Sequence, residues 1–179
     1  YICTDSYKIL NKAEELKIPA ILTSKNHENG TDRCAEALSK LSLNEEVLII
    51  NIQGDEPLIS PVLINRLIKN FNPKEMDILL PYLEIHKKNS LGYVKIVTNK
   101  KNKILYMSRS DIPNNFRKNK LLKSQVGITM FSKKALNAFY ENKSSNEDIE
   151  GIELLRVLET DLKMFTFKTT VNSKSVDYP

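Results

Sequence analysis

Residues 53–57, Gln-Gly-Asp-Glu-Pro, combine residue types that could carry chemistry. They follow residues 47–52, a nearly unbroken apolar run of the kind expected in a strand covered on both faces. In open α/β sheets, ligands bind beyond the carboxyl ends of the strands. A carboxylate there, here Asp55, can hold Mg²⁺ against phosphate oxygens, and Gly54 would let a ligand approach the backbone closely. Asp, Glu and Pro are also common where a strand simply enters a turn, so both interpretations stay open.

A second segment is suited to a turn that leads into a helix. Asn29-Gly30 favours a tight turn, and we expect Thr31 to cap a helix that begins at Asp32. The N–H groups at that helix terminus, with Arg33 in the first turn, could receive a polar heterocycle or an anion. Asp32 favours the alternative of a purely structural terminus, since its carboxylate already complements the helix dipole.

Two further segments offer charged side chains. Glu147, Glu150 and Glu153 are spaced by three, so a helix would place them in one acidic row. A solvated helix face is the competing interpretation of that row. Arg109 follows an expected strand and could clamp a substrate carboxylate through a bidentate pair, or could make a surface salt bridge instead.

The elements that must position these residues alternate between strand and helix. The expected strands are residues 1–4, 19–22, 47–52, 78–85, 93–98, 103–108, 126–131 and 164–170. The expected helices are residues 7–16, 31–41, 61–71, 133–140 and 147–158. Alternation over the first 80 residues predicts βαβ units, hence an α/β fold with a mostly parallel mixed sheet and helices on both faces. Residues 93–108 predict an added antiparallel hairpin, and residues 118–123 are the most loop-like internal stretch.

The composition fits a single domain and excludes several classes of protein. The 179 residues carry 27 Lys and Arg against 22 Asp and Glu, a net charge of +5. The positive charge is scattered, which disfavours a nucleic-acid interface.

No apolar run approaches the roughly 20 residues of a membrane-spanning helix, so we expect no membrane insertion. Two cysteines cannot form a disulfide framework, which favours a reducing, cytoplasmic compartment. His27 has no second His or Cys at metal-ligand spacing, and we expect it in a surface loop.

Taken together, these segments resemble the CMP-Kdo synthetases, the cytidylyltransferases that activate 3-deoxy-manno-octulosonate (Kdo). The most specific match is residues 51–57, which look like the family's Asn-x-Gln-Gly-Asp-Glu-Pro almost letter for letter. Further similar segments follow the family's order along the chain, at residues 29–33, 94–97, 105–109, 112–113, 126–128, 150–158 and 176–179.

The resemblance implies a Rossmann-like nucleotidyltransferase fold and a specific reaction. The reaction is Mg²⁺-dependent transfer of CMP from CTP to Kdo, giving CMP-Kdo and pyrophosphate for lipopolysaccharide synthesis. It also implies a homodimer. By the same resemblance, Asp55 and Asp177 are the catalytic pair that binds Mg²⁺. The implied nucleotide-binding residues are Asn29, Gly30, Arg33 and Gln53, and the implied sugar-binding residues are Arg109, Gln125 and Glu153.

Several positions depart from the family pattern, all on the sugar side. Gln125 replaces a His, Thr129 a Tyr and Leu154 a Gln. A second sugar-binding arginine falls at Phe116, with Arg117 one residue away. We therefore hypothesise the same reaction with an altered acid sugar such as an amino-Kdo. The alternatives are a cytidylyltransferase for another acid sugar, such as a nonulosonate, and a non-catalytic module that keeps the fold.

Two parts of the family pattern have no counterpart in these 179 residues. One is the first strand with the basic loop that grips the triphosphate, and the other is the helix after Val-Asp-x-Pro. We expect residues 1–179 to be a single nucleotidyltransferase domain truncated at both ends. We expect it to be inactive alone and active within a longer parent chain.

Overall fold

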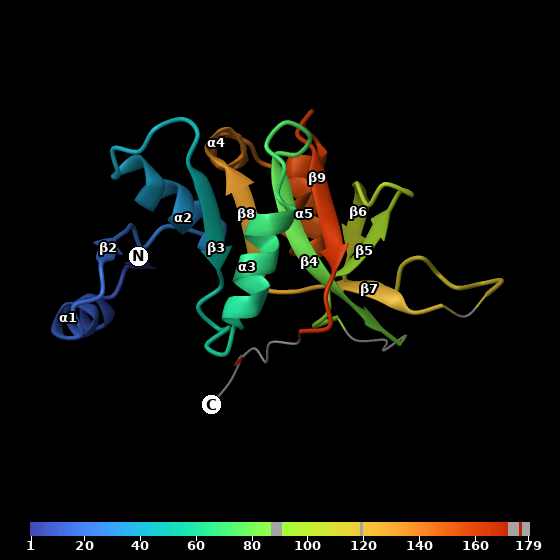
Figure 1. The fold of residues 1–179 in the computed structure, drawn as a ribbon, viewed down its shortest axis with the longest axis horizontal. Helices are drawn as coiled ribbons and strands as arrows, with labels where there is room; N and C mark the ends of the chain where they lie inside the picture. The colour runs from blue at the N-terminus through green and yellow to red at the C-terminus, as the bar shows by residue number, and fades with distance from the viewer. Residues whose placement is uncertain (87–90, 119, 172–175, 177–179) are drawn as a thin grey trace. The chain divides into compact units, whose positions relative to one another are not determined.

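The computed structural model describes residues 1–86, 91–118, 120–171 and 176. Asp177, one of the two expected metal ligands, therefore lies outside the described residues. The chain divides into two compact units, Tyr1–Val47 and Leu48–Pro179, which we call the N-terminal unit and the C-terminal unit (Figure 1). No helix in the described part of the chain is long and apolar enough to cross a membrane.

The N-terminal unit is a βαβ unit followed by a helix, as its sequence predicts. Strands β1 (Ile2–Thr4) and β2 (Ala20–Leu22) are parallel, and helix α1 (Tyr7–Glu15) connects them. Two parallel neighbours need such a crossover because the chain must return to the same end of the sheet. Helix α2 (Gly30–Ser39) follows β2. The carboxyl ends of both strands therefore lie at one edge, directly before α1 and before the loop that leads to α2.

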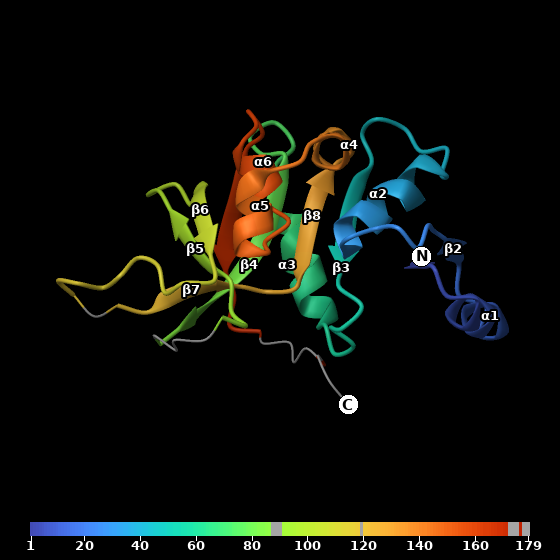
Figure 2. The ribbon, with the colours of Figure 1, turned by 180° about the vertical axis from the view of Figure 1, so that it is seen from behind.

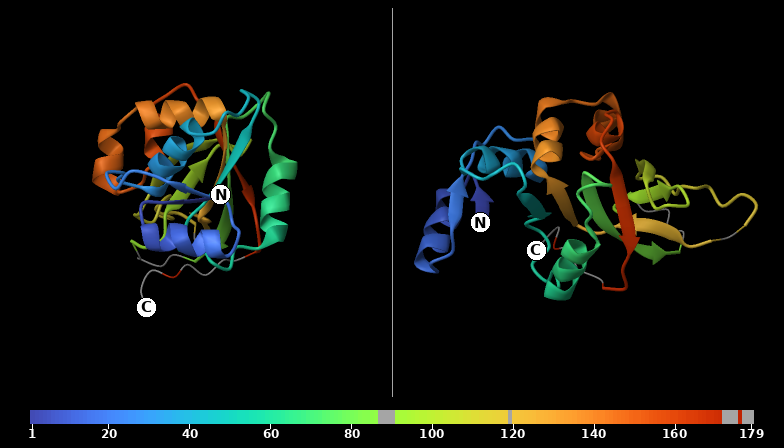
Figure 3. Two further views of the ribbon diagram at one scale, coloured as in Figure 1. Left: turned by 90° about the vertical axis from the view of Figure 1, so that its left-hand side faces the viewer. Right: turned by 45° about the horizontal axis from the view of Figure 1, so that its top comes forward.

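The C-terminal unit is built on a seven-stranded sheet with the order β3-β8-β4-β7-β5-β6, in which β9 also pairs with β4. Its strands are β3 (Leu48–Ile52), β4 (Ile78–Ile85), β5 (Lys95–Thr98), β6 (Ile104–Ser108), β7 (Leu122–Gln125), β8 (Ile128–Ser132) and β9 (Met164–Lys168). Of the strand pairs that the structure describes, β4–β9 is parallel (Figure 3, right) and the others in this sheet are antiparallel.

The expectation of a mostly parallel sheet is therefore wrong. A helical crossover does connect β3 to β4, and these two strands run in the same direction. They are not neighbours, however, because β8 lies between them and pairs antiparallel with both. The sequence shows the crossover but not the later strand that inserts there. Strand β7 begins within residues 118–123, which were expected to be a loop, and pairs on both sides with β4 and β5.

The predicted antiparallel hairpin is confirmed as β5 and β6, which face each other with Lys95 opposite Ser108. The side-chain oxygen of Asn99 accepts hydrogen bonds from the backbone N–H groups of Lys101 (2.9 Å) and Lys103 (3.0 Å). Asn102 adopts a left-handed φ of 62°. An Asn side chain that satisfies turn N–H groups explains why this polar stretch reverses the chain.

Helix α3 (Pro61–Asn70) packs on one face of the sheet (Figure 1). It starts as predicted, with Pro61 in its first turn and the Ser60 hydroxyl accepting from the Val62 N–H. Leu63 and Leu67 are fully buried and pack with residues of β4 and β8 in one hydrophobic cluster. Burying each of these leucine side chains stabilises the fold by roughly 2 kcal/mol.

The opposite face carries α4 (Lys133–Glu141), α5 (Ser145–Glu150) and α6 (Leu155–Leu158), which Figure 2 shows from behind. The expectation of a single helix over residues 147–158 is therefore wrong. Gly151 ends α5 in the left-handed conformation, with φ 61° and ψ 40°, and the chain restarts as α6 only at Leu155. Ile149, in α5, is 81% exposed.

Candidate active site

The loop after β3 is held in place by backbone hydrogen bonds. The Gln53 N–H donates to the Gly127 carbonyl (3.2 Å), and the Glu56 N–H donates back to the Gln53 carbonyl (3.1 Å). The Val176 N–H donates to the Asp55 carbonyl across 2.8 Å. Val176, the residue directly before Asp177 in the sequence, thus contacts the loop that carries Asp55.

Asp55 is exposed, and its carboxylate makes no hydrogen bond or ion pair with any residue that the structure describes. Within the described ranges, no three His, Cys, Asp or Glu side chains come close enough together to hold a metal ion. Asp55 is thus a single available carboxylate here, and its expected partner Asp177 is outside those ranges.

Glu56, in the Gln-Gly-Asp-Glu-Pro segment, is a buried carboxylate to which no role was assigned from the sequence. It is 9% exposed, and its Oε2 has no hydrogen-bond partner in the described part of the chain. A Cβ added to Gly127 would lie 2.6 Å from Glu56 Oε1, closer than van der Waals contact allows. Glycine at position 127 is therefore explained by the close approach of Glu56, and the two residues together shape the loop after β3.

Gln53 and Glu153 meet although they lie 100 positions apart. Gln53 Nε2 donates to Glu153 Oε1 at 3.3 Å, and both side chains are half-buried. Glu153 reaches this position because the chain turns between α5 and α6 after Gly151. The structure thus joins a residue expected to bind the nucleotide to one expected to bind the sugar.

The expected acidic row does not form, and neither does the solvated face that competed with it. Glu147 pairs with the fully buried Arg156, whose Nη2 lies 2.7 Å from Glu147 Oε1. Glu150 accepts hydrogen bonds from Ser108 Oγ (2.7 Å) and from the backbone N–H of Arg109 (3.0 Å). The three glutamates therefore have three different sets of partners.

Arg109 is held by backbone carbonyls and not by a surface carboxylate. Its Nε donates to the Glu150 carbonyl (2.9 Å), its Nη2 to the Gly151 carbonyl (2.8 Å) and its Nη1 to the Leu91 carbonyl (2.8 Å). A guanidinium has five N–H donors, one on Nε and two on each terminal nitrogen. Three are used here, which leaves one N–H on Nη1 and one on Nη2 without a partner in the described chain. These two donors suit a bidentate contact with a carboxylate.

The remaining sugar-side positions are dispersed. Gln125 lies in β7 opposite Tyr82, and Thr129 is buried in β8 opposite Asn51. Leu154 is 1% exposed, so it packs in the core. Phe116 is 92% exposed, in the loop that follows the cis Ile112–Pro113 peptide bond. The structure therefore connects Arg109 to the α5–α6 turn by hydrogen bonds and leaves Phe116 in solvent.

The nucleotide candidates of the N-terminal unit lie at the carboxyl ends of its strands. Asn29 caps α2, because its Oδ1 accepts from the Asp32 N–H at 2.8 Å. The expectation that Thr31 caps this helix is wrong, since α2 begins at Gly30, two residues before Asp32, and Thr31 lies inside it. An Asn side chain competes well for this position because its oxygen reaches the third N–H of the helix.

Arg33 joins three segments of the N-terminal unit. Its Nη2 pairs with Asp5 Oδ2 (3.1 Å) after β1. Its Nη1 donates to Thr23 Oγ1 (2.7 Å) and to the Ser24 carbonyl (3.2 Å) after β2. Arg33, in the first turn of α2, is thereby fixed where ligands bind in α/β sheets.

The loop that leads to Asn29 is anchored by Glu36. Glu36 accepts from Lys40 Nζ (2.6 Å), from the Ser24 N–H (2.8 Å) and from His27. These contacts, above all the hydrogen bond from Lys40, lower the pKa of Glu36 to about 2. His27 was expected at the surface, but its side chain is only 8% exposed. The signal that could have predicted the burial of His27 is the carboxylate of Glu36, nine positions later in the sequence.

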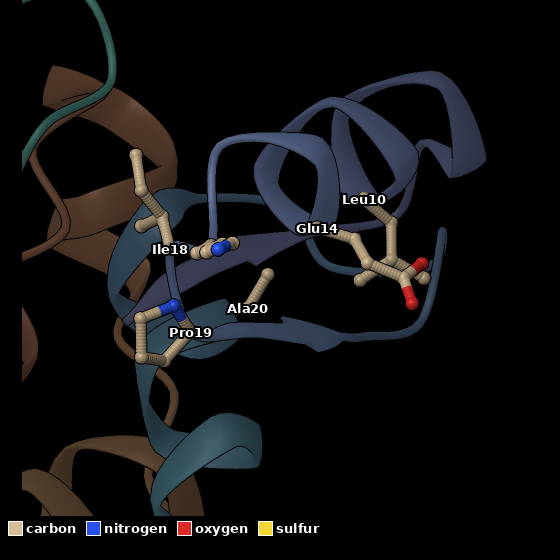
Figure 4. A pocket seen from close by; sticks show the side chains of 6 residues that line it. Leu10, Glu14, Ile18, Pro19 and Ala20 are labelled. Atoms are coloured by element: carbon tan, nitrogen blue, oxygen red, sulfur yellow. The ribbon is translucent and has the colours of Figure 1, made fainter.

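A separate open pocket of about 460 Å³ lies in the N-terminal unit, beside α1 and β2 (Figure 4). It is lined by Leu10, Glu14, Lys17, Ile18, Pro19 and Ala20. None of the expected site residues lines it, so it carries no part of the proposed chemistry.

Comparison with known proteins agrees with the resemblance found in the sequence. The family model for cytidylyltransferases matches residues 1–164. The 3-deoxy-manno-octulosonate cytidylyltransferase of Thermodesulfovibrio yellowstonii is 35% identical over 195 residues, covering 100% of this chain and 76% of the relative. The 8-amino-3,8-dideoxy-manno-octulosonate cytidylyltransferase of Shewanella frigidimarina is 34% identical over 186 residues, with the same coverage.

A solved structure gives the same result. It is that of CMP:2-keto-3-deoxy-manno-octonic acid synthetase complexed with CTP, which superposes with a TM-score of 0.86 at 27% identity. The match covers 97% of this chain and 73% of that one, so the present chain spans about three quarters of the length of its relatives. The chain therefore belongs to the family of the Kdo cytidylyltransferases and is a nucleotidyltransferase with the α/β fold of that family.

Proposed function

We propose that this chain contributes binding residues to the Mg²⁺-dependent transfer of CMP from CTP to Kdo or to its 8-amino relative, a reaction that supplies the activated sugar for lipopolysaccharide synthesis. The observation that carries the proposal is the hydrogen bond between Gln53 and Glu153. It brings together the expected cytosine contact and the expected sugar contact, which is what transfer between two bound substrates needs.

The residues around Asp55 fit a magnesium site. Mg²⁺ takes one or two carboxylates and completes its shell with waters and phosphate oxygens. Asp55 offers an exposed carboxylate without a partner in the described chain. Asp177 would be the second ligand, and the hydrogen bond from Val176 to the Asp55 carbonyl supports that pairing. Bound there, Mg²⁺ would offset the repulsion between two anionic reactants, about 4 kcal/mol for unit charges ~4 Å apart at an effective dielectric of 20.

The nucleotide side would use fixed hydrogen-bonding groups. Cytosine presents an amino donor and ring acceptors, and the amide of Gln53 supplies both an acceptor and donors. Arg33 is held by Asp5 and Thr23, so its guanidinium would need little reordering on binding. In the reaction, the anomeric hydroxyl of the sugar attacks the α-phosphorus, its proton is released, and pyrophosphate leaves with the β- and γ-phosphates.

The sugar side would be organised by Arg109 and Glu153. The two remaining N–H groups of Arg109 would bind the carboxylate of the acid sugar. Glu153 would accept a hydrogen bond from a sugar hydroxyl, or from the ammonium of an 8-amino sugar. Relatives named for the plain and the 8-amino sugar are similar to this chain to nearly the same degree, at 35% and 34% identity. The proposal therefore includes both sugars.

This proposal can be tested by the binding of CMP and of the sugar, which are the two parts of the product. Neither ligand carries a triphosphate, so the test does not depend on triphosphate binding. Isothermal titration would compare CMP, UMP and AMP, and then Kdo and 8-amino-Kdo added to the chain with CMP and Mg²⁺. We expect CMP to bind tightest and at least one of the two sugars to bind to the CMP complex. Equal binding of AMP and CMP would contradict a cytidylyltransferase. Tighter binding of Kdo than of 8-amino-Kdo would count against the hypothesis that the substrate is an altered acid sugar.

A further inference from the structure

Lys95 is a fully buried lysine in the strand β5. Its backbone lies between Ser108 of β6 and Ser124 of β7. Its ammonium donates to the backbone carbonyl of Arg109 and lies 3.4 Å from Asp111 Oδ1. The side chain of Asp111 is itself only 8% exposed. Removing an ammonium from water is costly, and apolar replacements of buried ion pairs are often neutral or stabilising, so stability alone is weak grounds for this arrangement.

Lys95 and Glu150 together hold the backbone of Arg109. The backbone N–H of Arg109 donates to Glu150 Oε2, and its carbonyl accepts from Lys95 Nζ. Both polar groups of this residue's backbone are therefore taken by charged side chains, one from α5 and one from β5. The guanidinium is oriented separately, by carbonyls at 91, 150 and 151. Without Lys95, the Arg109 carbonyl would lose its hydrogen bond to β5, and the peptide after Arg109 would keep only the bond from the Ser110 N–H to Ser108 Oγ (3.0 Å) in β6.

We propose that Lys95 is a positioning residue for the acid sugar: it fixes the backbone of Arg109 so that the two remaining guanidinium donors meet the sugar carboxylate. This inference rests on the proposed function, since it assigns Arg109 to the sugar. Lys95 itself is too deeply buried to touch a ligand. Its effect should therefore appear in sugar affinity and not in nucleotide affinity.

The test separates positioning from stability with two variants. Lys95→Met keeps most of the side-chain volume but leaves the Asp111 carboxylate without its ion pair, so we expect a large loss of stability. Lys95→Met combined with Asp111→Asn removes both charges and should regain most of that stability. Urea unfolding measures stability, and titration of CMP, then of Kdo or 8-amino-Kdo into the CMP complex, measures the two affinities.

We expect the double variant to bind CMP within about twofold of the wild type but the sugar roughly 10- to 100-fold more weakly, as for a displaced binding group. Asp111→Asn alone keeps the bond from Lys95 to the Arg109 carbonyl and should keep sugar affinity. Lys123→Met is the matched control, since that lysine in the next strand donates to Thr98 (2.6 Å) and not to Arg109.

The outcomes are distinct. Wild-type sugar affinity in the double variant would overturn the inference and leave Lys95 a purely structural residue. A loss in Asp111→Asn equal to that in Lys95→Met would also overturn it, because the ion pair would then be responsible. A wild-type chain that binds CMP but neither sugar would instead refute the proposed function, and the role of Lys95 with it.

Discussion

Gln53 and Glu153, 100 positions apart, share a hydrogen bond of 3.3 Å between the loop after β3 and the turn after α5. The donor belongs to the motif that resembles the family's cytosine-binding segment, and the acceptor to the one that resembles its sugar-binding helix. In the proposed function Gln53 turns its amide toward the bound base, so this bond would be exchanged when the nucleotide arrives. The pair therefore allows the two substrates to be tested separately.

Glu153→Ala should weaken sugar binding to the CMP complex by roughly tenfold to a hundredfold, the worth of a hydrogen bond to a charged group. CMP affinity should stay at or above the wild-type value, because Gln53 no longer has to leave a protein partner. Calorimetric titration of each ligand measures both effects. Glu141→Ala, at the exposed end of α4, serves as the control. Unchanged sugar affinity in Glu153→Ala would remove Glu153 from the sugar site.

Gly127→Ala should destabilise the chain by about 1–3 kcal/mol, because the new methyl group would meet the Glu56 carboxylate. Urea unfolding measures the loss. Combining it with Glu56→Ala should relieve the clash, whereas Glu56→Gln keeps the bulk and should not. If Glu56→Gln rescued as well as Glu56→Ala, charge and not space would explain the glycine.

Gly151→Ala should cost about 1–2 kcal/mol, the penalty for a side chain in the left-handed region. Gly54→Ala is the matched control. A Cβ at position 54 meets nothing within 4 Å and the backbone has no positive φ, so it should be nearly neutral. Equal stabilities of the two variants would contradict the account of the helix break.

Acid should weaken the N-terminal unit through Glu36. The folded pKa of about 2 lies below the ordinary value of 4.5, so the stabilisation is complete above pH 4.5 and is lost as pH falls toward 2. Glu36→Gln should lower the melting temperature at pH 7 and flatten its dependence on pH over that window. Circular-dichroism melts from pH 2 to 7 measure this, with exposed Glu14→Gln as control. An unchanged slope below pH 4.5 in Glu36→Gln would exclude Glu36 as the group responsible.

Local signals in the sequence predicted much of the fold. The start of α3, the β5–β6 hairpin and the β1–α1–β2 unit depend on neighbouring residues, and the structure confirms all three. Gly151 escaped detection because a glycine within an apolar 3.6-residue pattern costs a helix only about 1 kcal/mol, so the pattern does not reveal the break. The insertion of β8 between β3 and β4 is a pairing of distant segments and leaves no local trace.

In the candidate site, too, features that depend on neighbouring residues could be predicted, and contacts between distant segments could not. Gln53 lies in the loop after β3, and Arg33 lies in the first turn of α2, where its side chain contacts Asp5 after β1 and Thr23 after β2. The partners of Arg109 could not be predicted, because they are backbone carbonyls and carry no signature in the side chains. Lys95 did leave a signal, namely a charged residue between Val94 and Ile96 in a short apolar strand. Such an interruption predicts a buried charge with a specific partner.

The most direct test of the account is whether Asp55 and Asp177 hold one divalent cation together. Mn²⁺ would be titrated into the chain in the presence of CMP and followed by electron paramagnetic resonance, for the wild type, Asp55→Asn, Asp177→Asn and the exposed control Asp161→Asn. We expect one bound Mn²⁺ in the wild type and in the control, and roughly tenfold or greater weakening in each of the two site variants. Wild-type Mn²⁺ affinity in either Asp55→Asn or Asp177→Asn would contradict the proposed metal site.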